Sequence, residues 1–193
     1  MTHSAGSLNK AHRLLSPRIA YLIGTRSPSG EPNLIPISNA TSISVDPEQV
    51  LIAVHHRWVT CDNLCDAPGF TLSVPDFSQI DGAWKLGARY SGYSVESRAE
   101  KLATCGLGLD HTASQYGPIL SDGLGWMSCR IIERFSFGGD HLSFAAIVES
   151  VFFDDARFRN DGTPLQEIHP LMQVTGNIFA TAAPFTSVDY FER

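Results

Sequence analysis

Long apolar runs and clusters of basic residues are both missing from this chain of 193 residues. No window approaches the roughly 18 consecutive apolar residues that a membrane-spanning helix needs. The 14 basic residues are outnumbered by 20 acidic ones, which gives a formal net charge of −6. A nonspecific nucleic-acid binder presents a basic surface. We therefore expect no membrane and no nucleic-acid partner, and an anionic ligand would be held by a few local donors.

Cysteine is also scarce, and the four cysteines contain no CxxC pair. Zinc sites use closely spaced cysteines with nearby histidines, so the sequence predicts no metal site and reduced, packed thiols. Residues 1–10 are small and polar, without the apolar stretch of a signal peptide. We expect residues 1–16 to form a flexible N-terminal segment of a cytoplasmic protein.

The usual nucleotide-binding and nucleophile motifs are absent as well. No GxxxxGK[ST] sequence occurs, and residues 106–108 begin a GxGxxG pattern whose sixth position is His111. No strong strand precedes that pattern, so a Rossmann site is not expected. Residues 92–96 lack the second glycine of a nucleophile elbow. His55 and His56 would point to opposite faces of a strand and would not share a metal ion.

Strand-forming segments dominate what the chain does contain. The first of them follow one another through short turns, which is typical of an antiparallel meander. The last long pair is separated by Gly138-Gly139-Asp140, a strong hairpin signal. The predicted strands are residues 19–26, 33–45, 50–55, 70–74, 125–136, 142–153 and 176–182.

Helical composition is confined to segments between these strands, at residues 59–67, 76–85 and 95–105. The order shows no regular alternation of strand and helix, which argues against a doubly wound parallel sheet. Six or more strands with helices inserted predict a mainly β fold, as a closed or nearly closed barrel. The length and the lack of repeats favour a single domain.

Polar residues at the start of the helix predicted at 59–67 give the first functional signal. Arg57 precedes this helix, and Thr60 and Asn63 lie three residues apart near its beginning. A helix N-terminus offers free N–H groups, and a neighbouring guanidinium can bind phosphate through two bonds. The alternative is that Thr60 only caps the helix while Arg57 is solvated.

Seven short pieces then complete a pattern. They are Pro17-Arg18-Ile19-Ala20, Gly30 with Asn33-Leu34-Ile35-Pro36-Ile37-Ser38, Ser44-Val45-Asp46-Pro47, Thr60-Cys61-Asp62-Asn63-Leu64, Glu100-Lys101-Leu102 with Gly106-Leu107, Cys129-Arg130, and Gly139-Asp140-His141. In this order and spacing, from residue 17 to about residue 179, the chain resembles the flavin reductase-like FMN-binding proteins. No single piece is specific, but chance does not readily produce the ordered set.

The resemblance implies an FMN-binding split β-barrel over residues 17–183 that forms a homodimer, with FMN in a groove near the subunit interface. Residues 184–193 form a tail that matches nothing in the family pattern. The ribityl chain and ring would be lined by Asn33, Ile35, Ser38, Asn39 and Ser42, and the phosphate would be bound by Arg57, Thr60 and Asn63. Lys101 would add a second positive charge, Phe179 would cover the ring, and His141 would lie near the nicotinamide or the partner subunit.

The activity implied is hydride transfer from NAD(P)H to FMN, with FAD as an alternative flavin. Reduced flavin would either stay bound, as in a flavoredoxin-type electron carrier, or pass to a partner monooxygenase. A non-catalytic module that binds flavin or haem is the competing class, with His55, His56 or His141 as an axial ligand. The sequence leaves these alternatives open, along with the choice between NADH and NADPH.

Overall fold

The computed structural model describes residues 4–87, 97–182 and 184. Its strands are β1 (Arg18–Ile19), β2 (Tyr21–Arg26), β3 (Pro32–Ile37), β4 (Ala40–Val45), β5 (Glu48–His55), β6 (Gly69–Val74), β7 (Leu109–Asp110), β8 (Ile119–Leu120), β9 (Gly125–Ser136), β10 (His141–Phe153), β11 (Met172–Thr175) and β12 (Ile178–Ala180). Its helices are α1 (Val59–Asp66), α2 (Ile80–Leu86) and α4 (Arg98–Thr104), with 3-10 helices η1 (Leu8–Leu15) and η2 (Phe77–Gln79).

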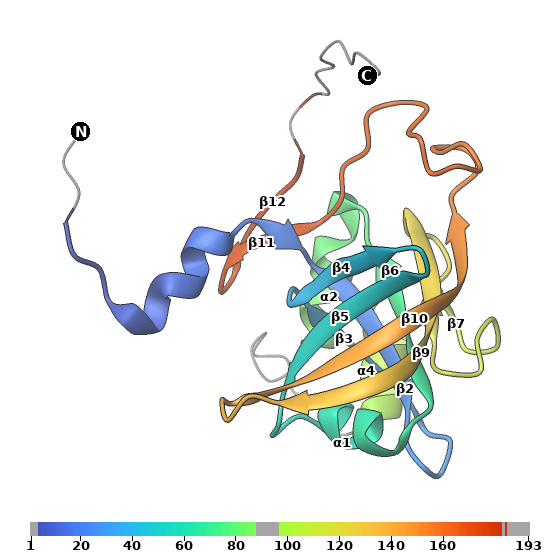
Figure 1. Cartoon of the computed structure of the whole chain (residues 1–193). Coiled ribbons are helices and arrows are strands. Elements are labelled where there is room, and N and C mark those ends of the chain that lie inside the picture. The colour runs from blue at the N-terminus through green and yellow to red at the C-terminus, as the bar shows by residue number, and fades with distance from the viewer. Residues whose placement is uncertain (1–3, 88–96, 183, 185–193) are drawn as a thin grey trace.

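Seven strands form one antiparallel sheet in the order β3-β2-β6-β9-β10-β5-β4, which curls into a barrel (Figure 1). β3 and β4 follow each other in the chain through residues 38–39, yet they are the two edges of this sheet and do not pair with each other. The barrel is therefore split between β3 and β4. A second sheet, β1-β11-β12, lies close to this opening and pairs an early strand of the chain with two late ones.

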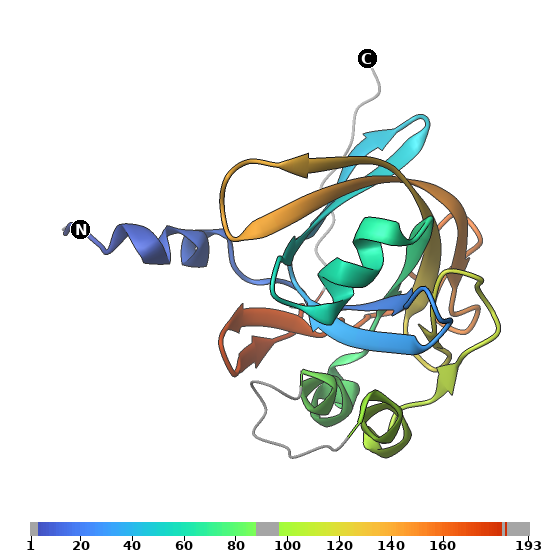
Figure 2. The same ribbon diagram turned by 90° about the horizontal axis from the view of Figure 1, so that it is seen from below.

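Side-chain alternation on β2 divides the core into two clusters. Ile23 points into the barrel, where it packs with Phe70, Phe144 and Leu64 of α1. Leu22, one residue earlier, points to the opposite face and packs in a second cluster with residues of α2 and α4. Figure 2 shows α1 over one end of the barrel and α2 and α4 side by side outside it. The two buried faces explain why β2 is buried at four consecutive positions, from Leu22 to Thr25.

The backbone of β2 touches the loop before β8 at a point where only glycine fits. A Cβ atom on Gly24 would lie 2.1 Å from the carbonyl oxygen of Pro118 and 2.3 Å from Oγ1 of Thr71. A Cβ atom on Gly117 would lie 2.3 Å from the carbonyl carbon of Gly24. Because backbone atoms cannot move aside as a flexible side chain can, this contact fixes the loop onto the barrel.

The predicted β-rich fold with inserted helices is confirmed, and so is the β9–β10 hairpin, whose turn contains Gly138 with a φ of 79°. The single strand predicted over residues 33–45 is wrong, because the chain breaks at 38–39 to give β3 and β4. The helix predicted at 95–105 is α4, which begins at Arg98; residues 95–96 lie outside the described chain.

Within the N-terminal segment predicted to be flexible, residues 8–15 form η1. This helix projects from the barrel and buries none of its residues (Figure 1). Strands β7, β8 and β11 are not predicted, because each is only two to four residues long, which is too short for an alternating pattern to show. Of the predicted C-terminal tail at 184–193, only residue 184 is described.

Replacing Gly24 with alanine is expected to destabilise the protein strongly, because the added methyl group would collide with backbone atoms of the neighbouring loop. We expect the free energy of unfolding, measured by urea denaturation, to fall by about 3 kcal/mol. Gly139→Ala is the matched control, since nothing lies within 4 Å of a Cβ atom there. Equal stability of the two variants would contradict the close contact.

Candidate functional site

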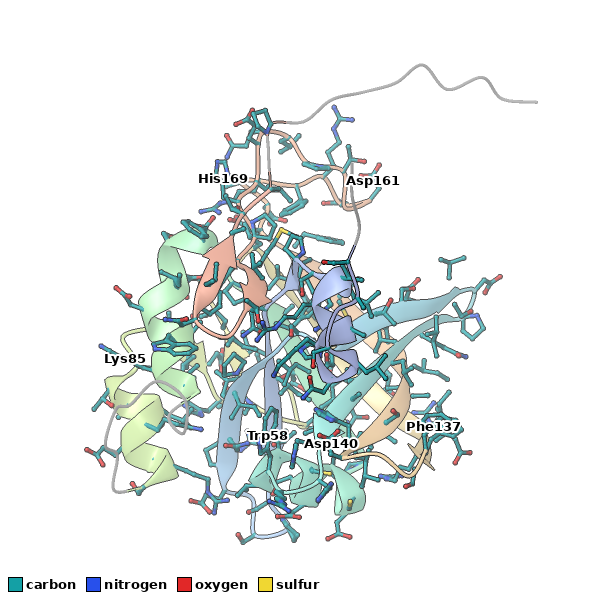
Figure 3. The ribbon with its side chains drawn as sticks, turned by 90° about the vertical axis from the view of Figure 1, so that its left-hand side faces the viewer. Trp58, Lys85, Phe137, Asp140, Asp161 and His169 are labelled. Atoms are coloured by element: carbon teal, nitrogen blue, oxygen red, sulfur yellow. The ribbon has the colours of Figure 1, made fainter. Side chains whose placement is uncertain are left out.

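A cavity of about 920 Å³ lies at the open side of the barrel. One wall is the exposed edge of β3, and the others come from β5, the start of α1, α2, α4, η1 and the β11–β12 hairpin. Trp58 and Asp140, which both line it, are labelled in Figure 3. The sequence-predicted residues on the cavity wall are Asn33, Ile35, Ser38, Asn39, Arg57, Thr60, Lys101, His141 and Phe179.

A buried polar network forms the deep end of the cavity. Nζ of Lys101 donates to Oδ1 of Asn33 at 3.4 Å, and Nδ2 of Asn33 donates to Oγ1 of Thr60 at 2.8 Å. Lys101 is only 8% exposed. Burial, with a smaller effect from the positive charge of Arg98, lowers the pKa of Lys101 to about 8. No carboxylate of the described residues forms an ion pair with it, so this end of the cavity has an unneutralised cation.

The start of α1 borders the same end. Its N-cap residue is Trp58, without a side-chain capping hydrogen bond, and Thr60 accepts its bond from Asn33. The alternative in which Thr60 caps its own helix is therefore not what the structure shows. Arg57 is exposed on the cavity wall, and within the described residues no ion pair involves its guanidinium.

Asn63 does not reach the cavity. It lies one turn further along α1, is buried, and donates through Nδ2 to Oγ1 of Thr25 at 3.0 Å. Thr25 lies opposite Asn33 in the β2–β3 pairing, so Asn63 supports the strand that carries the network. Its predicted position at the site is corrected to a supporting one behind the wall, because the rotation of the helix turns it into the barrel.

Ser42 also lies away from the cavity, which corrects its predicted place in the groove. It pairs with Val50 of β5, and residues opposite each other in a sheet share a face. Val50 belongs to the barrel core, whereas the cavity-lining Ala53 points to the other face. Ser42 is exposed and donates to Glu48 at 3.2 Å.

The opposite end of the cavity is polar too, where Ser38 and Asn39 bond to two residues that the sequence analysis did not select. Nη1 of Arg18 donates to Oδ1 of Asn39 at 2.9 Å, and Ser38 donates to Oε1 of Gln173 at 3.0 Å. Arg18 lies opposite Gln173 in the β1–β11 pairing. Arg18 belongs to the first of the seven family pieces, so the sequence could have indicated it as a site residue. Nothing in the sequence indicated Gln173, because β11 was not predicted.

Apolar side chains occupy the space between the two polar ends. Ile35 of β3 and Ala53 of β5 contribute from the barrel. Trp84 of α2 and Phe179 of β12 contribute from the other side, with their rings in an edge-to-face contact at 5.8 Å between centroids. An elongated cavity with polar ends and an apolar middle suits a flat ring system attached to an anionic group.

Histidines gather at the rim. Nδ1 of His141 lies 2.6 Å from Oδ1 of Asp140, and this bond is the first cause of a lowered pKa of Asp140. The ring of His55 lies 5.3 Å from that of His141 and 4.8 Å from that of His56. Partial burial and the neighbouring His141 lower the pKa of His55. Because Nδ1 of His55 accepts the backbone N–H of Arg57 at 3.0 Å, His55 carries its proton on Nε2 when neutral.

The prediction that His55 and His56 point to opposite faces of a strand is wrong, because β5 ends at His55 and the two rings stack. Even so, no group of three or more His, Cys, Asp or Glu residues in the described chain has the arrangement of a metal site. Among the same residues, no helix is long and apolar enough to cross a membrane.

Sequence comparison identifies the protein family. Residues 13–181 match the flavin reductase-like domain, and the chain belongs to that family. The resemblance found from the seven pieces is thereby confirmed.

Solved structures agree on the fold. An FMN-binding protein from Thermus thermophilus with bound 1-cyclohex-2-enone superposes with a TM-score of 0.77 at 22% identity, covering 98% of this chain and 99% of that one. The flavoredoxin of Desulfovibrio vulgaris (Miyazaki F) gives 0.78 at 18% identity, covering 98% of each chain. The NADH:FAD oxidoreductase SgcE6 of Streptomyces globisporus, in complex with NAD and FAD fragments, gives 0.71 at 20% identity, covering 93% and 94%.

Lys101→Met is expected to stabilise the ligand-free protein, because the pKa of Lys101, about 8 against 10.5 for a free lysine, means that its charged form is disfavoured by folding. The free energy of unfolding at pH 7 should rise by about 1–3 kcal/mol. The stability of the wild type should rise between pH 8 and about 10.5, where the folded protein has lost the proton first. That rise should be absent in the variant.

The exposed Lys10 offers the control, since Lys10→Met should change neither stability nor its pH dependence. A Lys101→Met variant less stable than the wild type would contradict an unneutralised buried charge.

Proposed function

We propose that the protein binds FMN in this cavity and acts as an NAD(P)H-dependent flavin oxidoreductase. The observation that carries the proposal is the buried cation Lys101, which has no carboxylate partner in the described chain and lies in a network with Asn33 and Thr60 at one end of an elongated cavity. Since a buried charge is retained at a cost to stability, an anionic ligand is the natural partner.

The residues present fit the cofactor. Lys101, Thr60 and Arg57 would hold the phosphate, and the apolar stretch around Ile35 would receive the ring. Bound flavin supplies the capacity to accept a hydride and pass electrons on. The protein has only to bind it, orient it and leave one face accessible. FAD remains an alternative ligand, because the similar SgcE6 is described as an NADH:FAD oxidoreductase.

His141 is proposed to act where the reduced nicotinamide approaches. The Asp140 carboxylate fixes its ring through Nδ1, which leaves Nε2 to contact a substrate at the rim.

Two fates for the electrons follow from the family. The similarity to flavoredoxin favours a carrier that keeps its flavin, whereas a reductase of the two-component type would release it to a partner monooxygenase. Survival of the yellow colour after dialysis would favour the first and its loss the second.

We also propose a homodimer. Several large apolar side chains on β4 and β10 are exposed, and exposed apolar surface commonly marks an interface between subunits. They are Ile43, Val45, Val151 and Phe152. Sedimentation of the purified protein at the mass of two chains is the result that this proposal requires.

The function is tested by titrating the purified protein with FMN and recording its visible spectrum. Arg57→Ala should weaken FMN binding by more than tenfold, because a phosphate would lose a charge-assisted bond. Arg159→Ala removes an exposed arginine outside the cavity and should bind as the wild type does. A wild-type protein that is colourless and binds neither FMN nor FAD would overturn the proposed function.

His141→Ala should raise the KM for reduced nicotinamide at least fivefold while the Kd for FMN changes less than twofold. The physical reason is its place in the partly exposed histidine group at the rim, outside the buried network of Lys101, Asn33 and Thr60. Steady-state kinetics and the FMN titration measure the two quantities. Parallel changes in both would show instead that His141 supports the bound flavin.

A further inference from the structure

The cavity is cationic at both ends. Lys101 lies near Asn33, at the start of β3, and Arg18 lies near Asn39, just beyond its end. Ser38 lies five residue steps beyond Asn33, which corresponds to roughly 17 Å at about 3.3 Å per residue of extended chain. A single ligand that satisfies both ends must be elongated and must present hydrogen-bond acceptors at both of its ends.

Arg18 has an incomplete set of hydrogen bonds. Its Nε is buried and has no hydrogen-bond partner among the described residues. No acidic residue of the described chain forms an ion pair with it, and its guanidinium bonds to the neutral side chain of Asn39. An unsatisfied buried donor costs about 1–3 kcal/mol. The side chain of Arg18 is part of the cavity wall, so a ligand that accepts hydrogen bonds from its guanidinium would offset this cost.

The position of Arg18 is fixed by its surroundings. The β1–β11 pairing sets it opposite Gln173, and the amide of Gln173 is itself held by Ser38 at 3.0 Å and by the carbonyl of Gly176 at 2.9 Å. Nη1 is held by Asn39, whose own carbonyl accepts the backbone N–H of Ala53. The guanidinium is therefore preorganised, and a bound ligand has little ordering left to impose on it.

From these observations we propose that Arg18 donates to the carbonyl-bearing edge of the bound isoalloxazine ring and favours its reduced state. The inference rests on the proposed function. Lys101, Thr60 and Arg57 gather at the other end and account for the phosphate, which leaves the ring for the Arg18 end. A fixed positive charge stabilises negative charge most strongly in a site with little water.

The charge balance of the reaction makes Arg18 an electrostatic group only. Hydride transfer oxidises the reduced nicotinamide and adds two electrons and one proton to the ring, which gains one negative charge. Guanidinium groups stay protonated in proteins, so Arg18 neither gives nor takes a proton. Its charge lowers the free energy of the product state more than that of the reactant state.

The test compares the wild type with Arg18→Gln and Arg18→Lys. Anaerobic titrations give the Kd values of oxidised and reduced FMN, and potentiometry gives the midpoint potential of the bound flavin. We expect Arg18→Gln to lose at least tenfold of the preference for reduced over oxidised FMN, which is about 30 mV for a two-electron couple. Arg18→Lys should retain part of it, since the charge is kept but the Nε–H is lost.

Arg13→Gln is the matched control, because it removes one positive charge from exposed η1, five residues away and off the cavity wall. Its potential should equal that of the wild type, and thermal unfolding of every variant checks that the fold is intact.

Three results would overturn the inference while leaving the proposed function standing. They are an unchanged potential in Arg18→Gln, equal weakening of oxidised and reduced FMN, and a raised KM for the dinucleotide alone, which would assign Arg18 to a dinucleotide phosphate. A wild-type protein that binds no flavin would overturn both.

Discussion

The unpaired edge of β3 is the constraint on which the site depends. β3 and β4 are neighbours in the chain, but the break at residues 38–39 sends β4 to pair with β5 at the far edge of the sheet. The barrel stays open there, and the backbone and side chains of β3 become a wall that other segments can approach. Helices α2 and α4, the β11–β12 hairpin and η1 all reach the cavity at this opening. A closed barrel would have filled this space with its own side chains.

At both ends of the cavity, a buried polar group lowers the stability of the ligand-free protein and offers a contact to a bound ligand. Lys101 is buried without a carboxylate partner, and Nε of Arg18 is buried without an acceptor, within the part of the chain that the structure describes. Each group is costly in the empty protein and becomes favourable when a ligand supplies the missing charge or acceptor. Both are held in place by neutral amides, from Asn33 and Asn39, which orient the cations without neutralising them.

The rim has a different character from the interior. His55, His56 and His141 lie together with Asp140 as the acidic member, and the group is open to solvent in part. An open, aromatic rim suits a ligand that enters and leaves, whereas the buried networks below suit one that stays. This division fits the proposed activity, in which a nicotinamide would come and go at the rim while the flavin occupies the interior.

Local pattern in the sequence determined most of the long strands, the Gly138-Gly139 turn, the beginning of α1 and the set of polar residues along β3, because alternation, turn chemistry and capping act over a few residues. Tertiary structure decided which of these residues share the cavity. Period-two alternation predicts the same side-chain orientation for Ser38 and Ser42. Only the strand break and the pairing of Ser42 with Val50 place them in different surroundings. Likewise, only the rotation of α1 turns Asn63 inward. Arg18 and Gln173 are 155 residues apart, and only the β1–β11 pairing makes them neighbours, since long-range pairing leaves no local trace in the sequence.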